Sequence, residues 1–166
     1  ENYNTRLMLE DKEGYKCNSK LNDLKSGYAP RRFHSSNLYT IQNIKLWCKL
    51  NNKPFELVSD KYINNYAKLK WKCLKEDCGE KFETIWNTTF LGCGCPFCSG
   101  KKVGISNCLA TKNPELAFEW HPILNGELTP YDITANSGKK VWWKCKECGH
   151  EWDTVVFRRM NGTGCP

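Results

Sequence analysis

The chain has 166 residues, of which 40% are hydrophobic and 26% charged, a balance that excludes an intrinsically disordered chain. No apolar run approaches the roughly eighteen residues of a membrane span, so we expect no membrane partner. The net charge of +7 is spread along the sequence and is compatible with a polyanionic partner. Eleven cysteines indicate disulfides in a secreted protein or bound metal in a cytosolic one, and their odd number and the lack of a leader favour metal.

The first part of the chain predicts turns and short strands. In residues 1–38, Gly14 and Pro30 are turn signals, and we expect a small β-rich segment there. Residues 39–54 then predict an amphipathic helix, because apolar side chains recur at helical spacing before Asn-Asn-Lys-Pro ends the run. Thr40 is the expected cap of that helix.

An internal repeat follows. The segment KLKWKCLKEDCGEKFETIW (68–86) aligns with KKVWWKCKECGHEWDTVVF (139–157), since both carry Trp-Lys-Cys, then a second cysteine and a glycine. In each copy the second cysteine lies 17 positions before a Gly-Cys-Pro cysteine. These pairs are Cys78 with Cys95, and Cys148 with Cys165. Two modules therefore share one plan.

The repeat predicts an α+β fold of small zinc-stabilised modules with short helices. KLKWKC alternates apolar and basic residues, as a half-buried strand does, and EKFETIW alternates again through Trp86. Pro96 stands where a helical turn could begin, which favours tandem treble-clef modules over zinc ribbons. A second short helix is expected over NPELAFEWHP. We place the modules at residues 39–104 and 105–166.

The paired cysteines predict two structural Zn²⁺ sites, because such sites take four thiolate or imidazole ligands delivered as two close pairs. The expected ligands are Cys73, Cys78, Cys95 and Cys98 in the first site, and Cys145, Cys148 and Cys165 in the second. His150 is an alternative ligand there. Cys93 is expected to be a spare thiol, since Thr163 stands at its place in the second copy, and no role is assigned to Cys17, Cys48 or Cys108. Disulfides and an iron–sulfur cluster are less favoured by the spacing.

The second site is expected to close beyond the chain. By analogy with Cys98, its fourth ligand would stand two residues after Pro166. The chain begins with Glu1 rather than Met. We therefore expect both ends to continue in a longer protein.

The residues from 107 to 166 carry a set of short motifs. They are Leu109-Ala110, Pro114 to Ala117, Glu119 to His121, Asn125, Pro130, Trp142 to Cys145, Gly149 to Trp152, Arg158 or Arg159, and Gly164 to Pro166. On these motifs the segment resembles the bacterial and phage zinc-ribbon, or treble-clef zinc finger, domains that occur in tandem arrays. It departs from their pattern only in the last cysteine. Residues 38–100 look like a diverged relative.

That resemblance implies a function. Such domains occur in phage and mobile-element proteins, sometimes beside endonuclease domains of homing or mismatch-repair (Vsr-like) type. It therefore implies a DNA-recognition or accessory region, with no catalysis in this segment and a cytoplasmic location in a bacterial or phage-infected cell.

Basic residues are the candidate contacts to nucleic acid, because they neutralise phosphates while exposed aromatic rings stack on bases. They are Arg31, Arg32, Lys70, Lys72, Lys101, Lys102, Lys139, Lys140, Lys144, Arg158 and Arg159. The competing interpretation is a merely solvated strand face, with Trp71 and Trp142 in the core.

Three functions are compared. A zinc-built DNA- or RNA-binding array is favoured, and a protein-interaction scaffold is the alternative. A nuclease is the least favoured. His121 and Asn125 are the one candidate pair of nuclease residues, but the first repeat has no counterpart to them. We therefore expect no catalytic residues in this chain.

Overall fold

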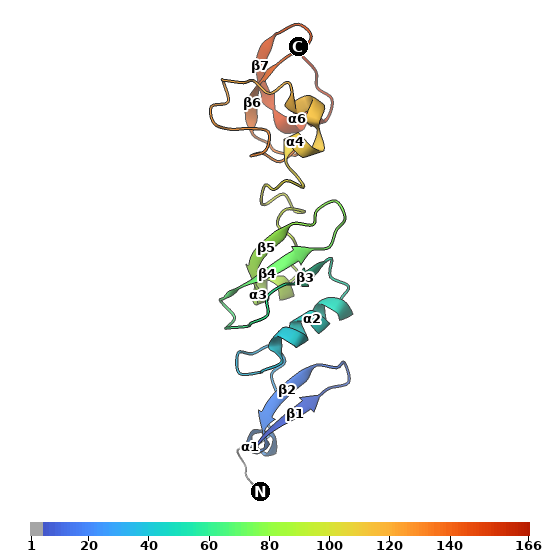
Figure 1. Ribbon diagram of the computed structural model, residues 1–166, viewed down its shortest axis with the longest axis vertical. Coiled ribbons are helices and arrows are strands. Elements are labelled where there is room, and N and C mark those ends of the chain that lie inside the picture. Colours follow the sequence, from blue (N-terminus) through green and yellow to red (C-terminus); the bar gives the residue numbers. More distant parts are fainter. Residues whose placement is uncertain (1–4) are drawn as a thin grey trace. The chain divides into compact units, whose positions relative to one another are not determined.

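A computed structural model describes residues 5–166 (Figure 1). The chain forms two compact units: one holds the residues up to Lys75 together with Lys81–Gly94, and the other holds Glu76–Glu80 together with Cys95–Pro166. Short helices and three small antiparallel sheets make up an α+β fold, as the sequence predicts. The module boundaries at residues 39 and 105 divide the chain by its repeat and stay a prediction.

The N-terminal part is a β-hairpin. Strand β1 (Arg6–Glu10) pairs antiparallel with β2 (Lys16–Lys20), and a short helix α1 (Leu21–Lys25) follows. The carboxylate of Asp11 holds the turn by accepting the backbone N–H groups of Glu13 and Tyr15, each at 3.0 Å. This hairpin confirms the predicted β-rich segment; the helix was not predicted.

Helix α2 (Thr40–Leu50) confirms the amphipathic helix, with Ile44 and Trp47 buried. Asn43 ties it to β2, because its side chain accepts the N–H of Lys16 at 2.9 Å and donates to the carbonyl of Lys16 at 2.7 Å. Thr40 is not the expected cap: it is the first helical residue, and its hydroxyl donates to carbonyl oxygens instead of accepting an N–H. No helix within residues 5–166 has the length and apolar character needed to cross a bilayer.

The first repeat is a three-stranded sheet followed by a helix. Strands β3 (Phe55–Leu57), β4 (Lys68–Cys73) and β5 (Lys81–Ile85) pair in that order, and α3 (Trp86–Phe90) comes next. Trp86 begins that helix rather than extending β5, contrary to the predicted strand. The turn into α3 places the ring of Trp86 against the rings of Trp47 and Phe33, at centroid distances of 5.1 and 4.9 Å.

The second repeat has the same hairpin and helix. Its elements are α4 (Leu109–Lys112), α5 (Pro114–Ala117), β6 (Lys140–Lys144), β7 (Glu151–Val155) and α6 (Val156–Met160). Asn113 caps α5 by accepting the N–H of Leu116 at 3.0 Å, which confirms a helix there in a shorter form. The core gathers around Trp143, which is fully buried.

One tryptophan contact recurs in both copies. The indole N–H of Trp71 donates to the carbonyl of Thr84 at 3.3 Å, and that of Trp143 donates to Thr154 at 3.2 Å. The hairpin registers also correspond, although the first copy has two more residues between its knuckle cysteines. The loop between these two cysteines, which we call the knuckle loop, accommodates the two extra residues. Each residue pair between β4 and β5 therefore has a counterpart between β6 and β7.

A third strand position is filled differently in the two copies. In the first repeat β3 pairs with β4. In the second, an isolated bridge joins Trp120 to Trp143, and the side chain of Asn125 bonds the backbone of Trp142, accepting its N–H at 2.8 Å and donating to its carbonyl at 2.9 Å. A side-chain amide thus continues the pairing along the outer edge of β6.

Candidate metal centres

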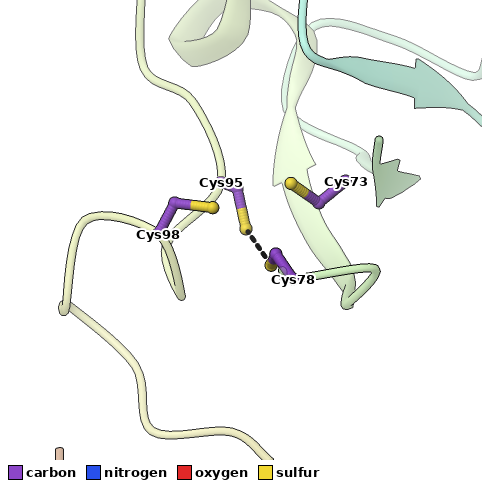
Figure 2. Close-up of side chains that lie close together, drawn as sticks. All are labelled: Cys73, Cys78, Cys95 and Cys98. Atoms are coloured by element: carbon purple, nitrogen blue, oxygen red, sulfur yellow. Dashed lines mark hydrogen bonds between the residues drawn. The ribbon is translucent and has the colours of Figure 1, made fainter. Parts of the chain in front are cut away.

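The first cysteine group lies where the knuckle loop meets the chain that follows α3 (Figure 2). Cys73 ends β4, Cys78 lies in the loop before β5, and Cys95 and Cys98 come after α3. Their four sulfur atoms all lie within 4.8 Å of one another. The sulfur atoms of Cys78 and Cys95 are 3.7 Å apart.

This spacing fits a tetrahedral zinc ion. With Zn–S bonds of about 2.3 Å, the edge of the sulfur tetrahedron is about 3.8 Å. A disulfide would bring two sulfur atoms to about 2.05 Å, and no cysteine within residues 5–166 forms one. Four thiolates at tetrahedral spacing are also a typical structural zinc set. The group therefore fits a zinc site.

Local backbone geometry holds the ligands of the first centre. Gly79 has φ of +62°, so the chain turns sharply after Cys78. Burial raises the pKa of Cys95, although the backbone N–H groups of Phe97 and Cys98 point at its sulfur and oppose that rise. A single turn, with the N–H of Ser99 donating to the carbonyl of Cys95 at 3.2 Å, replaces the helix expected from Pro96. The turn is sufficient to place Cys98.

The second group contains Cys145, Cys148 and Cys165, again with all sulfur atoms within 4.8 Å. Cys148 and Cys165 lie 3.7 Å apart, the same separation as in the first centre. The backbone N–H groups of Cys148 and Glu147 lower the pKa of Cys145. Loss of solvent and the two neighbouring sulfur atoms raise the pKa of Cys165 to about 11. Both cysteine groups thus fit zinc.

The remaining candidates lie outside these groups. The His150 ring stacks on Trp152, with centroids 5.9 Å apart and 15° between the planes, and it is not a member of the second group. Its role as an alternative ligand stays a prediction. Cys93 is exposed, whereas the three other unassigned cysteines are buried: Cys17, Cys48 and Cys108. Burial raises the pKa of Cys48 to about 11, which makes it an unreactive thiol.

One comparison with known proteins bears on the second repeat. A family model described as "Probable Treble clef zinc finger domain" matches residues 116–166, which contain all three cysteines of the second centre. No match was found among curated proteins. The match supports a zinc finger built on the knuckle and Gly-Cys-Pro motifs; the first repeat lies outside it.

Two of the predicted arginine contacts have structural partners. Arg159 is 8% exposed, forms an ion pair with Glu119 and lies over the rings of Trp143 and Trp152. The predicted surface role of Arg159 is therefore corrected: its guanidinium lies inside the second repeat. Arg32 pairs with two carboxylates of the N-terminal hairpin, each at 2.7 Å.

The other basic candidates are exposed. Lys140 and Lys144 pair with Asp153 and Glu151 at 2.5 and 2.9 Å. The rest form no ion pair within residues 5–166: Arg31, Lys70, Lys72, Lys101, Lys102, Lys139 and Arg158.

Four unpaired lysines gather on one side of the first repeat. Strand β4 alternates strictly, so Lys68, Lys70 and Lys72 share the exposed side while Leu69, Trp71 and Cys73 face the core. Lys81 joins them from β5, directly opposite Lys72. We call these four residues the lysine face. Among residues 5–166 no carboxylate oxygen lies within 4.0 Å of their ammonium groups.

The corresponding side of the second repeat is neutral. Trp142 stands where the first repeat has Lys70, and Glu151 stands where it has Lys81. The two lysines that remain are both ion-paired, as described above. This side of the first repeat carries four lysines and two acids, Glu56 and Glu83, so its charge is positive. The same side of the second repeat carries two lysines and two acids, so its charges balance. The two copies have diverged in charge but not in framework.

His121 and Asn125 have structural tasks. The Nδ1 atom of His121 accepts the N–H groups of Ile123 and Leu124, at 3.2 and 3.0 Å, and this fixes the turn after the bridge. Its Nε2 atom lies 3.2 Å from a carboxylate oxygen of Glu151, in an alignment that makes no hydrogen bond. Both polar groups of the Asn125 amide are engaged with the backbone of Trp142.

Proposed function

We propose that this chain is a zinc-stabilised array that binds nucleic acid, DNA in the first place, through the lysine face of its first repeat. The single observation that carries the proposal is that face: its four exposed ammonium groups form no ion pair within residues 5–166, and the other side of the same strand buries Trp71. Lysines neutralise phosphates and release counterions, and this contribution dominates the affinity of such proteins. The zinc sites would hold the sheet that presents them.

The arrangement of the charges supports an anionic partner. Lys72 and Lys81 are directly opposite each other across the hairpin, and like charges in that position destabilise a sheet. A phosphate bound between them would remove the repulsion. The second repeat, with Glu151 at the position of Lys81, has no such conflict.

We further propose that the array is an accessory region of a larger phage or mobile-element protein, such as an endonuclease, and is not itself an enzyme. The zinc finger match over residues 116–166 supports a binding role, since the cysteine sets are structural in type. A cytoplasmic location belongs to the same proposal, because zinc thiolates and free cysteines suit a reducing compartment.

A protein-interaction scaffold is the second candidate. The second repeat favours it, because exposed apolar side chains accompany its neutral outer side. Phe118 is 86% exposed, Ile123 76% and Trp142 38%. Surfaces that combine low charge with exposed aromatic rings are typical of protein contacts.

The test is a native gel of zinc-loaded protein with labelled duplex and single-stranded DNA, with Mg²⁺ present, over a series of salt concentrations. A shift that weakens steeply with salt and leaves the DNA intact supports the array. No shift at low salt favours the scaffold. DNA cleavage that disappears in His121→Ala, in a variant whose melting temperature is unchanged, would favour a nuclease.

A further inference from the structure

A cavity in the N-terminal hairpin gathers positive charge. It has a volume of about 570 Å³ and lies where the open end of the β1–β2 hairpin meets the segment before α2. Three cationic side chains line it from three different segments: Arg6 from β1, Lys20 from the end of β2, and Arg31 from the following loop. Among the lining residues within 5–166, Asp23 is the one carboxylate.

These three cations lack the partners that their neighbours have. In the same hairpin Lys16 pairs with Glu10 at 3.7 Å, and Arg32 pairs with Asp11 at 2.7 Å. Within residues 5–166 no carboxylate oxygen lies within 4.0 Å of the cationic groups of Arg6, Lys20 or Arg31. Lys16 and Arg32 are thus paired within the hairpin, whereas the three cavity cations are not.

The hairpin register makes this placement costly. Arg6 and Lys20 are directly opposite each other at the open end of the sheet. Like charges in cross-strand positions destabilise a hairpin unless an anion lies between them. Two arginines and a lysine around one cavity also provide the forked donors that phosphate oxygens accept in pairs.

We propose that this cavity binds a phosphate group. A phosphate carries about −1.5 to −2 charges near neutral pH, which matches three cations reduced by Asp23. Tyr28 lines the same cavity and is 71% exposed, so its ring is available to a base or sugar attached to the phosphate. The phosphate can thus come from a nucleotide or nucleic acid, or be free in solution. The proposal is independent of the lysine face.

In the experiment, inorganic phosphate is titrated into the zinc-loaded full chain, and the heat of binding is measured by calorimetry. The variants are Lys20→Gln and Arg31→Gln, and Lys12→Gln in the hairpin turn is the matched control, since it is exposed and does not line the cavity. We expect phosphate binding by the wild type, a loss of about tenfold or more in each cavity variant, and no change in the control. Lys70→Gln, on the lysine face, should also bind phosphate normally.

A melt without phosphate separates binding from folding. Lys20→Gln should melt at the same or a higher temperature than wild type, because it removes the repulsion from Arg6. Weak binding by a variant that melts no lower is the result that the proposal requires. Absence of phosphate binding in the wild type, an equal loss in Lys12→Gln, or a lower melting temperature for Lys20→Gln would overturn it.

A second titration identifies the source of the phosphate. It compares a nucleoside 5′-monophosphate with the unphosphorylated nucleoside. Tighter binding of the monophosphate than of inorganic phosphate, with no binding of the nucleoside, assigns the cavity to nucleotides or nucleic-acid ends. Equal binding of the two phosphates assigns it to the free ion. Binding of the nucleoside alone would contradict a phosphate site.

Discussion

Arg159 forms a buried ion pair with Glu119, 40 residues earlier in the chain. At the equivalent position the first repeat has Thr89, which is fully buried and needs no charged partner. Removing Arg159 leaves Glu119 charged and largely enclosed. We expect Arg159→Met to lower the free energy of unfolding by about 3–5 kcal/mol, measured by denaturant titration of the zinc-loaded chain.

Two controls accompany that variant. Arg158→Met, at an exposed position, should change stability by no more than about 0.5 kcal/mol. The double variant Arg159→Met with Glu119→Gln should recover part of the loss, because the unpaired charge is gone. If the double variant is no more stable than Arg159→Met alone, the ion pair is not what Arg159 contributes.

Zinc binding should weaken as the pH falls from 8 to 6. The thiols must lose their protons to bind the ion, so each proton released favours the bound state at higher pH. In the second centre the pKa of Cys165 is raised to about 11, so this thiol holds its proton tightly, while the lowered pKa of Cys145 lets that thiol ionise more readily. A competition titration with a chromogenic chelator measures the affinity, and a flat profile would exclude thiolate ligands.

Removal of zinc should also change how the fold responds to alkali. In the metal-free chain the raised pKa of Cys165 means that the folded state prefers the thiol. That contribution to stability is present below the ordinary thiol pKa and is lost as the pH rises toward about 11. Thermal melts of chelated protein should therefore decline above about pH 9, relative to zinc-loaded protein.

Neutralising the lysine face should weaken DNA binding more than the same change in the second repeat. We expect Lys70→Gln with Lys81→Gln to reduce the slope of log affinity against log salt by about 1 to 2 on duplex DNA. Lys140→Gln with Lys144→Gln is the matched control, since those lysines are already paired with acids. Filter binding over a salt series measures both, and equal effects would rule out a special role for the face.

Gly104 should be intolerant of a side chain. A Cβ atom there would lie 2.6 Å from a carboxylate oxygen of Glu80 and 2.7 Å from the ring of Phe97. We expect Gly104→Ala to displace residues 99–107 and to increase their cleavage by a protease. Gly138→Ala, where a Cβ would meet nothing within 4 Å, is the control. Equal cleavage in both variants would show that the close packing around Gly104 does not determine the order of residues 99–107.

Local sequence patterns predicted the framework well. Strict alternation in residues 68–73 is sufficient to predict β4 and the burial of Trp71, because a strand has a two-residue period. Paired cysteine spacing likewise predicted both metal groups, since short loops bring their sulfur atoms together. The hairpin at the N-terminus was expected only in outline.

Features that depend on distant partners were missed or misread. The sequence alone predicts Arg159 at the surface, because its carboxylate partner Glu119 is 40 residues away. Lys81 was overlooked because its place beside Lys72 depends on the hairpin register, which a loop of different length would change. The alternating pattern predicts Trp86 in a strand. Its helical position instead accompanies contacts with the rings of Trp47 and Phe33, which are distant in sequence.

The amide of Asn125 has a consequence for association between molecules. An unpaired sheet edge offers its N–H and C=O groups to any extended chain and so invites aggregation. By occupying both groups of Trp142, Asn125 closes that side of β6 to strand addition. Many copies of such a repeat can then stand in one polypeptide, or meet at high concentration in a cell, without their hairpins joining into fibres through this edge.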